Sequence, residues 1–184
     1  MRKLIFAINT TLDGCVDHTK QFVDEEALAY NAQLLGDADL LVFGRKTYQL
    51  MVPYWPEVLK NPSEAKADRE FARAFDSISK LVFSRSLDSV EGRNTRIART
   101  SLRDEMLRLK QEQGKNILVG GVDIPSQLME LGLIDEYRFV LGPIVAGAGR
   151  RLLEGVSLPE RLHLKLVESK VFKSGCVAVH YSKQ

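Results

Sequence analysis

The sequence has little of what builds disulfide scaffolds, zinc sites or membrane spans. Among its 184 residues are only two cysteines, Cys15 and Cys176, and three histidines scattered along the chain. Two thiols are too few for a disulfide framework or a multi-thiolate zinc site. The first apolar run, Leu4–Ile8, has five residues, far short of the ~18 needed to span a membrane and shorter than the core of a secretory signal. We therefore expect a cytoplasmic protein with reduced thiols, no metal site and no membrane contact.

A strong excess of charge of one sign is also missing. The chain carries 26 Lys and Arg against 24 Asp and Glu, a formal net charge of +2. Proteins that bind nucleic acid through bulk charge normally show a strongly basic face, so we expect no nucleic-acid partner. A small basic site for a phosphorylated ligand remains compatible with this balance. The length and the 45% hydrophobic content predict one globular domain over residues 1–184.

What the sequence does contain is a series of short apolar runs separated by helix-like segments. Runs bounded by turn formers or charge are typical of strands buried on both faces, and four occur here: Leu4–Ile8, Leu40–Phe43, Leu81–Phe83 and Ile117–Val119. Capping residues and apolar stripes predict helices between them, over Asp24–Leu35, Ser63–Phe75, Ser101 to about Gly114, and Pro125–Leu131.

The C-terminal part changes character. Its apolar segments are longer, and Lys173–Gly175 is a turn signal between two of them, Leu162–Phe172 and Cys176–Tyr181. This pattern predicts an antiparallel hairpin. The whole reads as an α/β protein whose mixed sheet is mostly parallel and is flanked by helices.

Three of the predicted strands end in residues suited to a phosphorylated ligand. Gly44, Arg45 and Thr47 follow Leu40–Phe43 and open a helix. Glycine allows close approach of a ligand, a helix N-terminus offers free N–H groups, and arginine forks onto phosphate oxygens. This pattern alone equally fits an ordinary strand–turn–helix junction with solvated charge.

The other two strand ends are weaker signals on their own. Ser84 and Arg85 follow Leu81–Phe83 and could hold the 2′-phosphate of NADP, although a surface arginine is the commoner role. Gly120 and Gly121 follow Ile117–Val119 and would serve equally in a tight turn, and no G-x-G-x-x-G fingerprint is present. Because the carboxyl ends of parallel strands share one edge of a sheet, the three signals together indicate a dinucleotide phosphate site.

These motifs, in this order, resemble the dihydrofolate reductase-like superfamily, and most closely the reductase domain of bacterial riboflavin biosynthesis proteins. The matching segments are Thr11–Gly14, Gly44–Tyr48, Phe83–Arg85, Gly120–Gly121, Leu131–Glu136 and Gly142–Gly149. The resemblance implies a three-layer fold with an eight-stranded mixed sheet, NADPH as cofactor and a homodimer.

The resemblance also implies roles for individual residues. Gly44, Arg45 and Thr47 would hold the cofactor's phosphates, and Ser84 and Arg85 its 2′-phosphate end. Gly120 and Gly121, joined by an unusual peptide bond, would lie along the pyrophosphate. Ala7 would border the nicotinamide, and Asp13 and Gly14 would lie in a mobile loop over the active site.

Two departures bear on the activity. Val119 and Cys15 stand where the riboflavin-pathway reductases usually carry a Glu and a Lys associated with a phosphorylated ribosyl-pyrimidine. Our leading hypothesis is an NADPH-dependent reductase that transfers a hydride to a small planar heterocycle, pterin- or pyrimidine-like. The alternatives are 5-amino-6-(5-phosphoribosylamino)uracil reductase and a non-catalytic NADPH-binding module.

The residues around the substrate are less well specified. The proton would come from water or from Asp13, whereas Asp24, Glu25 and Glu26 are interpreted as favourable charges at a helix start. Asn9, Tyr54 and Trp55 are candidate substrate contacts, the last two because Pro53 and Pro56 would hold them in a rigid loop. Val167, Val171 and Phe172 are candidates for an apolar dimer surface.

Overall fold

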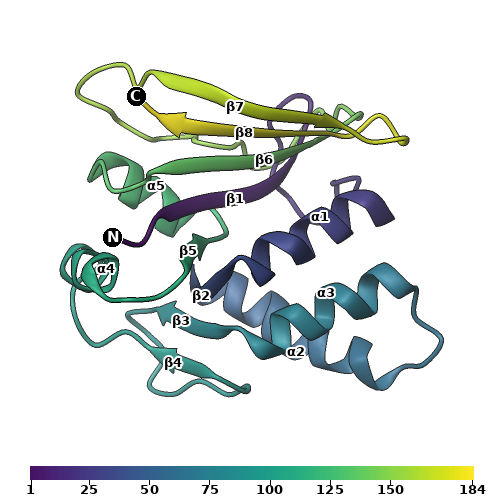
Figure 1. The fold of residues 1–184 in the computed structure, drawn as a ribbon, viewed down its shortest axis with the longest axis horizontal. Coiled ribbons are helices and arrows are strands. Elements are labelled where there is room, and N and C mark those ends of the chain that lie inside the picture. Colours follow the sequence, from purple (N-terminus) through teal and green to yellow (C-terminus); the bar gives the residue numbers. More distant parts are fainter.

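The fold is known from a computed structural model that describes all 184 residues. Its centre is one eight-stranded sheet in the order β4-β3-β2-β5-β1-β6-β8-β7 (Figure 1). The strands are β1 (Leu4–Thr11), β2 (Ala38–Gly44), β3 (Ser79–Phe83), β4 (Thr95–Ile97), β5 (Asn116–Val119), β6 (Glu136–Gly142), β7 (Leu164–Val171) and β8 (Val177–Lys183). The first six pair in parallel, and β8 joins β6 and β7 antiparallel. The predicted mixed sheet with its C-terminal hairpin is confirmed.

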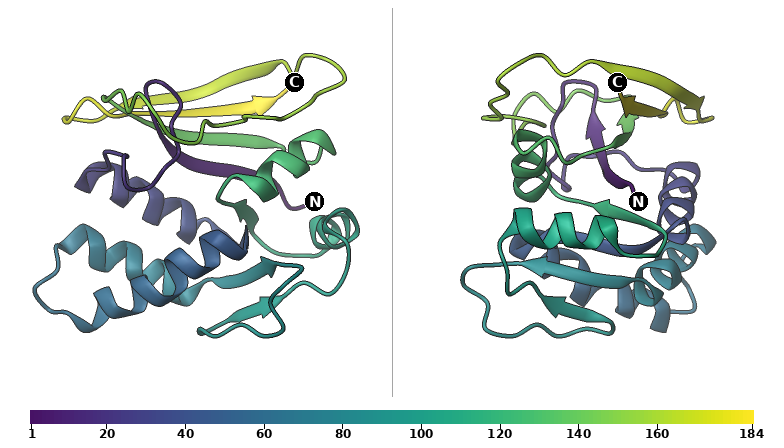
Figure 2. Two further views of the ribbon diagram at one scale, coloured as in Figure 1. Left: turned by 180° about the vertical axis from the view of Figure 1, so that it is seen from behind. Right: turned by 60° about the vertical axis from the view of Figure 1, so that its left-hand side comes forward.

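Five helices cover the two faces of the sheet, which makes three layers. They are α1 (Glu25–Gly36), α2 (Arg45–Lys60), α3 (Lys66–Ser77), α4 (Leu102–Gln111) and α5 (Asp123–Glu130). The first three gather on one side of the sheet and the last two on the other (Figures 1 and 2). None of them is both long and apolar enough to cross a membrane.

Strand β1 shows why the predicted strands have unbroken apolar sequences. Side chains alternate between the two faces of a strand, and here each face meets its own helix layer. Leu4 and Phe6 belong to the core cluster that includes residues of α4 and α5, whereas Ile5 belongs to the cluster that includes residues of α1, α2 and α3. The part of the strand that is covered on both sides, Leu4–Ile8, is therefore apolar at every position.

Helix α2 differs from the sequence prediction. Pro53 and Pro56 lie inside it, so Tyr54 and Trp55 are helical residues rather than members of a rigid loop. Each proline removes one helical N–H donor, but packing offsets this loss: Val52 and Val58 are buried, and the Trp55 ring lies 4.4 Å from that of Phe71 on α3.

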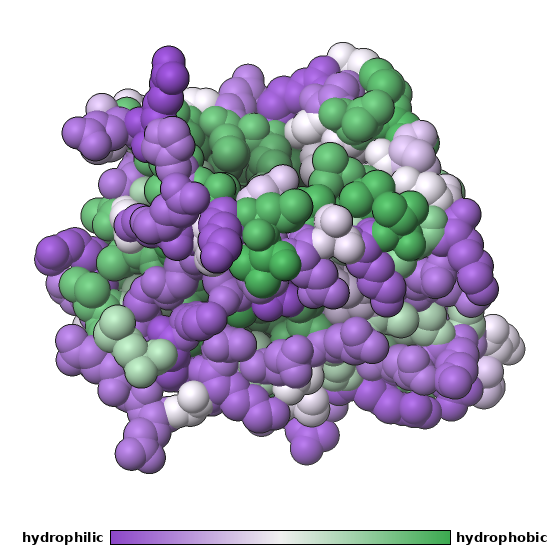
Figure 3. Space-filling view, turned by 45° about the horizontal axis from the view of Figure 1, so that its top comes forward, coloured by the Kyte–Doolittle hydropathy of each residue, from purple (hydrophilic) through white to green (hydrophobic).

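The exposed edge strand β7 carries two of the three apolar residues predicted to form a surface, and the third, Phe172, is buried. Val167 and Val171 are 54% and 74% exposed, and Leu166 beside them is 51% exposed. Phe172, by contrast, is buried against Ala27 of α1 in a separate small core cluster. Figure 3, turned so that the top of Figure 1 comes forward, shows hydrophobic residues gathered over the upper half of the molecule.

Candidate functional site

A long groove runs along the edge of the sheet where β1, β2, β3 and β5 end. It encloses about 2120 Å³, and half of its lining residues are hydrophobic. The predicted site residues that line it are Ala7, Asn9, Gly44, Arg45, Thr47, Tyr54, Trp55, Ser84, Arg85, Gly120 and Gly121, whereas Asp13 and its neighbour Gly14 do not. Segments more than a hundred residues apart in sequence thus meet at one site, as the shared edge of parallel strands requires.

The start of helix α2 offers unpaired backbone donors to this groove. Gly44 is its N-cap and provides no side-chain acceptor, so the first-turn N–H groups have no partner within the helix. The next residue, Arg45, is exposed and its guanidinium donates to Ser86 Oγ at 2.7 Å. Free N–H groups and a guanidinium at one point form a site suited to an anion.

The two glycines after β5 have different structural roles. Gly121 has a φ of +80°, and a Cβ placed on it would overlap the hydroxyl of Thr47. Gly120 lies outside that left-handed region, its N–H donates to Val42 O at 2.9 Å, and a Cβ on it would meet no atom within 4 Å. Gly121 therefore makes the turn, while Gly120 leaves its side of the groove open for close approach of a ligand.

The resemblance implied an unusual peptide bond between these two glycines, and the structure differs from that expectation. The structure contains no cis peptide bond. The chain changes direction here through the positive φ of Gly121 instead.

Strand β3 ends in a loop organised by Ser84. Its hydroxyl accepts the N–H groups of Ser86 and Leu87, at 3.1 and 3.0 Å. Arg85 is left exposed at the groove and forms no ion pair. Ser84 thus shapes the loop, and Arg85 supplies its free positive charge.

The end of the groove beside Asn9 carries a set of side-chain amides that sequence reasoning largely missed. Asn9 Oδ1 accepts from Asn31 Nδ2 of α1 at 3.0 Å, and Asn9 O accepts from Gln21 Nε2 at 2.9 Å. Trp55 and the 57%-exposed Tyr54 line the same groove. The amides can exchange hydrogen bonds with a polar ring edge, and the aromatic side chains provide apolar surface for a flat ring.

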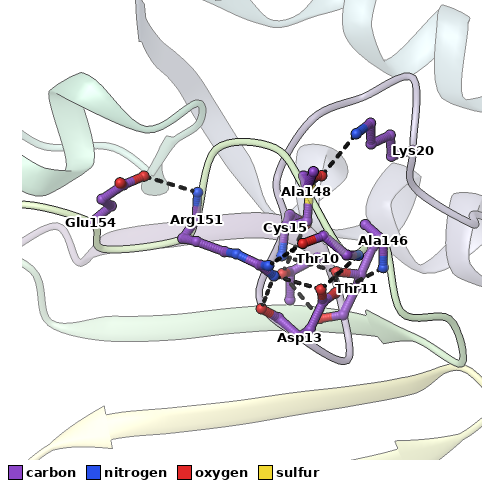
Figure 4. A network of polar contacts seen from close by, with 10 residues as sticks. Thr10, Thr11, Asp13, Cys15, Lys20, Ala146, Ala148, Arg151 and Glu154 are labelled. Carbon is purple, nitrogen blue, oxygen red and sulfur yellow. Dashed lines mark hydrogen bonds and ion pairs between the residues drawn. The ribbon is translucent and has the colours of Figure 1, made fainter.

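Asp13 lies outside the groove, within a network that joins two loops (Figure 4). Its carboxylate accepts from the Thr11 hydroxyl, from the N–H groups of Ala146 and Gly147 and from the Arg151 guanidinium. The hydrogen bond from Thr11 and then that from Arg151 hold the pKa of Asp13 well below its usual range. A general acid must keep its proton near the working pH, so this geometry favours a loop-fastening role over the predicted proton donor.

With this geometry in view, comparison with known proteins identifies the family. Residues 2–178 match the RibD C-terminal domain. The chain belongs to this family. The resemblance read from the motifs is therefore confirmed, and so is the dihydrofolate reductase-like fold.

One curated relative and two solved structures with a similar fold match nearly the whole length of this chain. The uncharacterized protein YyaP of Bacillus subtilis is 28% identical over an alignment of 185 positions that covers 98% of this chain and 94% of YyaP. A putative riboflavin biosynthesis protein from Shewanella has a TM-score of 0.71 at 21% identity, with 99% of both chains covered. A pyrimidine reductase-like protein from Corynebacterium diphtheriae has a TM-score of 0.66 at 16% identity, with 100% of this chain and 92% of that chain covered.

The two positions that depart from the riboflavin-pathway pattern are both buried. Val119 and Cys15 are each 0% exposed, and the Cys15 thiol lies 3.7 Å from Ala148 O. Neither position therefore presents the charged side chain, Lys or Glu, that the riboflavin-pathway pattern has there.

Proposed function

We propose that this chain is an NADPH-dependent reductase that transfers a hydride to a small planar heterocycle of the pyrimidine or pterin type. The observation that carries the proposal is the convergence of Gly44, Gly120 and Arg85 on one groove at the ends of parallel strands. Membership in the RibD C-terminal domain family and likeness in fold to a protein described as pyrimidine reductase-like support it.

The residues present fit a dinucleotide phosphate cofactor. The unpaired N–H groups beyond Gly44 and the Arg45 guanidinium suit its phosphates, and the open side of Gly120 gives its chain room. Arg85, exposed and without an ion-pair partner, suits the 2′-phosphate that distinguishes NADPH from NADH. When bound, the nicotinamide supplies the hydride, and the protein supplies orientation and electrostatics.

The chain's own residues then orient the substrate and leave protonation to the solvent. The amides of Asn9 and Asn31 would align the ring beside Ala7. Hydrogen bonds from Thr19 lower the pKa of Asp17, and the ion pair with Arg150 lowers that of Asp123, so these two groove carboxyls are poor acids near neutral pH. His18 and Asp68 also line the groove, and no contact in the structure directs either of them at the ring position beside Ala7, so we propose that the proton comes from water that enters the open groove.

The single tryptophan makes the cofactor proposal easy to test. Trp55 lines the groove, so we expect its fluorescence to be quenched on titration with NADPH, at lower concentrations than with NADH. Absence of quenching together with absence of heat in calorimetry would refute the proposal.

A non-catalytic NADPH-binding module is the second candidate, favoured by the fastening of Asp13 in the loop network. It differs from the first in turnover. Oxidation of NADPH, followed at its absorbance band across a panel of dihydropterins, aminouracils and quinone-like acceptors, would support the reductase. Tight binding with no oxidation would support the module. Complementation of a strain that lacks the riboflavin-pathway reductase tests the phosphoribosylaminouracil activity.

We also propose that the chain forms a homodimer through β7. An edge strand leaves one side of its backbone unpaired, and Val167 and Val171 are exposed on this one. Exposed apolar groups on an edge strand are typical of surfaces that pair with another chain.

A further inference from the structure

Arg150 lines the groove although no sequence motif marks it. It lies in the loop between β6 and β7, and its Nη2 is 2.5 Å from Asp123 Oδ1. Asp123 is the first residue of α5, two positions after Gly121. The ion pair therefore stands beside the glycine turn, where the groove is open to a ligand.

The backbone that carries Arg150 is fixed to the loop after β1. Arg150 O accepts from Val16 N at 2.9 Å, and the next residue, Arg151, forms a β-bridge with Cys15. Arg151 also pairs with Asp13 at 2.6 Å, within the network of Figure 4. The Arg150 side chain, 42% exposed, can thus change partner while its backbone stays in place.

The surroundings of Asp123 are those of an anion site. Three sources of positive charge surround its carboxylate. They are the N-terminal end of helix α5, the guanidinium of Arg150 and the ammonium group of Lys46 at the start of α2. An ion pair as exposed as this one adds little to folding stability. A diphosphate offers a guanidinium more acceptor oxygens than one carboxylate does, and in the two-pronged geometry that arginine favours.

We propose that Arg150 is a further cofactor-binding residue, which exchanges Asp123 for the pyrophosphate of a bound dinucleotide. This inference rests on the proposed function. It makes Asp123 a competitor of the ligand, and it makes Asp13 and Arg151 positioning residues that hold Arg150 at the groove.

The test is the affinity of four proteins for NADPH and NADH, measured by Trp55 fluorescence and by calorimetry. The proteins are the parent chain, Arg150→Gln, Asp123→Asn and the control Arg103→Gln. Arg103 is an exposed arginine of α4 that does not line the groove. Thermal unfolding of each variant establishes that it is folded.

We expect Arg150→Gln to weaken both cofactors by the same factor, roughly tenfold, as for the loss of one charged hydrogen bond. The factor is shared because both cofactors contain the pyrophosphate. Asp123→Asn should tighten both by about threefold, since it removes an exposed ion pair that binding must break. Arg103→Gln should change neither.

Three results would overturn the inference. Unchanged binding by Arg150→Gln would remove Arg150 from the site, and a loss confined to NADPH would assign it to the 2′-phosphate instead. Weaker binding by Asp123→Asn would show that the ion pair is structural. If the parent chain bound neither cofactor, the proposed function itself would fail, which is a distinguishable outcome.

Discussion

Alanine substitutions at the two adjacent glycines after β5 should have different effects: one should lower the folding stability and the other the affinity for the cofactor. An alanine at Gly121 must adopt the φ of +80° and displace the Thr47 hydroxyl. An alanine at Gly120 meets no atom within 4 Å and has no left-handed backbone to adopt, but its methyl group points into open space at a groove-lining position. We expect Gly121→Ala to lose stability and Gly120→Ala to lose cofactor affinity.

The size of the Gly121→Ala effect follows from three contributions. Left-handed backbone costs an alanine about 1–2 kcal/mol, and pushing the Thr47 side chain off its rotamer adds about 0.5–1.5 kcal/mol. The reduced freedom of the unfolded chain returns about 0.4–1 kcal/mol. The net loss is about 2 kcal/mol, which lowers the unfolding temperature of a chain this long by about 4–8 °C. Gly120→Ala carries only the favourable contribution, so its unfolding temperature should stay level or rise slightly.

Calorimetric unfolding and Trp55 titration with NADPH on the same preparations give both quantities. Adding Thr47→Ala removes the hydroxyl that the new methyl group would overlap, so Gly121→Ala should cost less in that background by the roughly 0.5–1.5 kcal/mol of the displaced rotamer. The reasoning is wrong if the two glycine variants lose stability equally, or if Gly120→Ala binds NADPH as the parent chain does.

Four further predictions concern single side chains. Arg85→Gln should weaken NADPH about tenfold and leave NADH unchanged; an equal loss in both titrations would contradict its assignment to the 2′-phosphate. Asp13→Asn should lower the unfolding temperature by loosening the loop network, yet keep the pH profile of turnover, whereas a shifted acid limb would restore Asp13 as proton donor. Burial lowers the pKa of Lys80 to about 8, so the unfolded chain binds more protons between pH 8 and 10.5. Stability in urea should therefore rise across that range by about 2 kcal/mol relative to Lys80→Met, and an identical pH dependence would refute this. Val171→Lys should convert a dimer to a monomer in sedimentation, and a monomeric parent chain would disprove the dimer.

The parts of the fold that the sequence predicted are those with strong local signals. Strands that are covered on both faces appear in the sequence as unbroken apolar runs. Ser101 accepts the Asp104 N–H and so caps α4, as the spacing of these two residues predicted. Strand β4 was missed because it has three residues and buries only Ile97. The prediction ended helix α2 before Tyr54 because the prolines Pro53 and Pro56 are typical of a loop. In the structure the helix continues through both prolines, because its side chains pack against α3.

In the groove too, the residues with a local sequence signal were predicted and those placed by tertiary contacts were missed. Gly44 ends β2, Gly120 directly follows β5 and Arg85 lies two residues after β3, so a strand prediction places all three at one edge. Gln21 and Arg150 lie in long loops without periodicity, and only tertiary contacts bring them to the groove. The loop residue that the sequence did single out, Asp13, belongs instead to the network that fixes those contacts.

Residues at the strand ends and residues in the loops of such a groove should differ in how freely they can be substituted. The glycines that open the groove are set by strand ends that two core clusters hold on both faces, so they should persist wherever the sheet persists. The side chains beside Asn9 come partly from a loop and from the surface of α1, where a substitution disturbs little packing. Proteins that share this fold at 16–21% identity can therefore keep the glycine turns of the groove while they differ in the side chains around the position of Asn9. The β6–β7 loop should be less free to change than the other loops, because Asp13 holds it in place and because it carries Arg150.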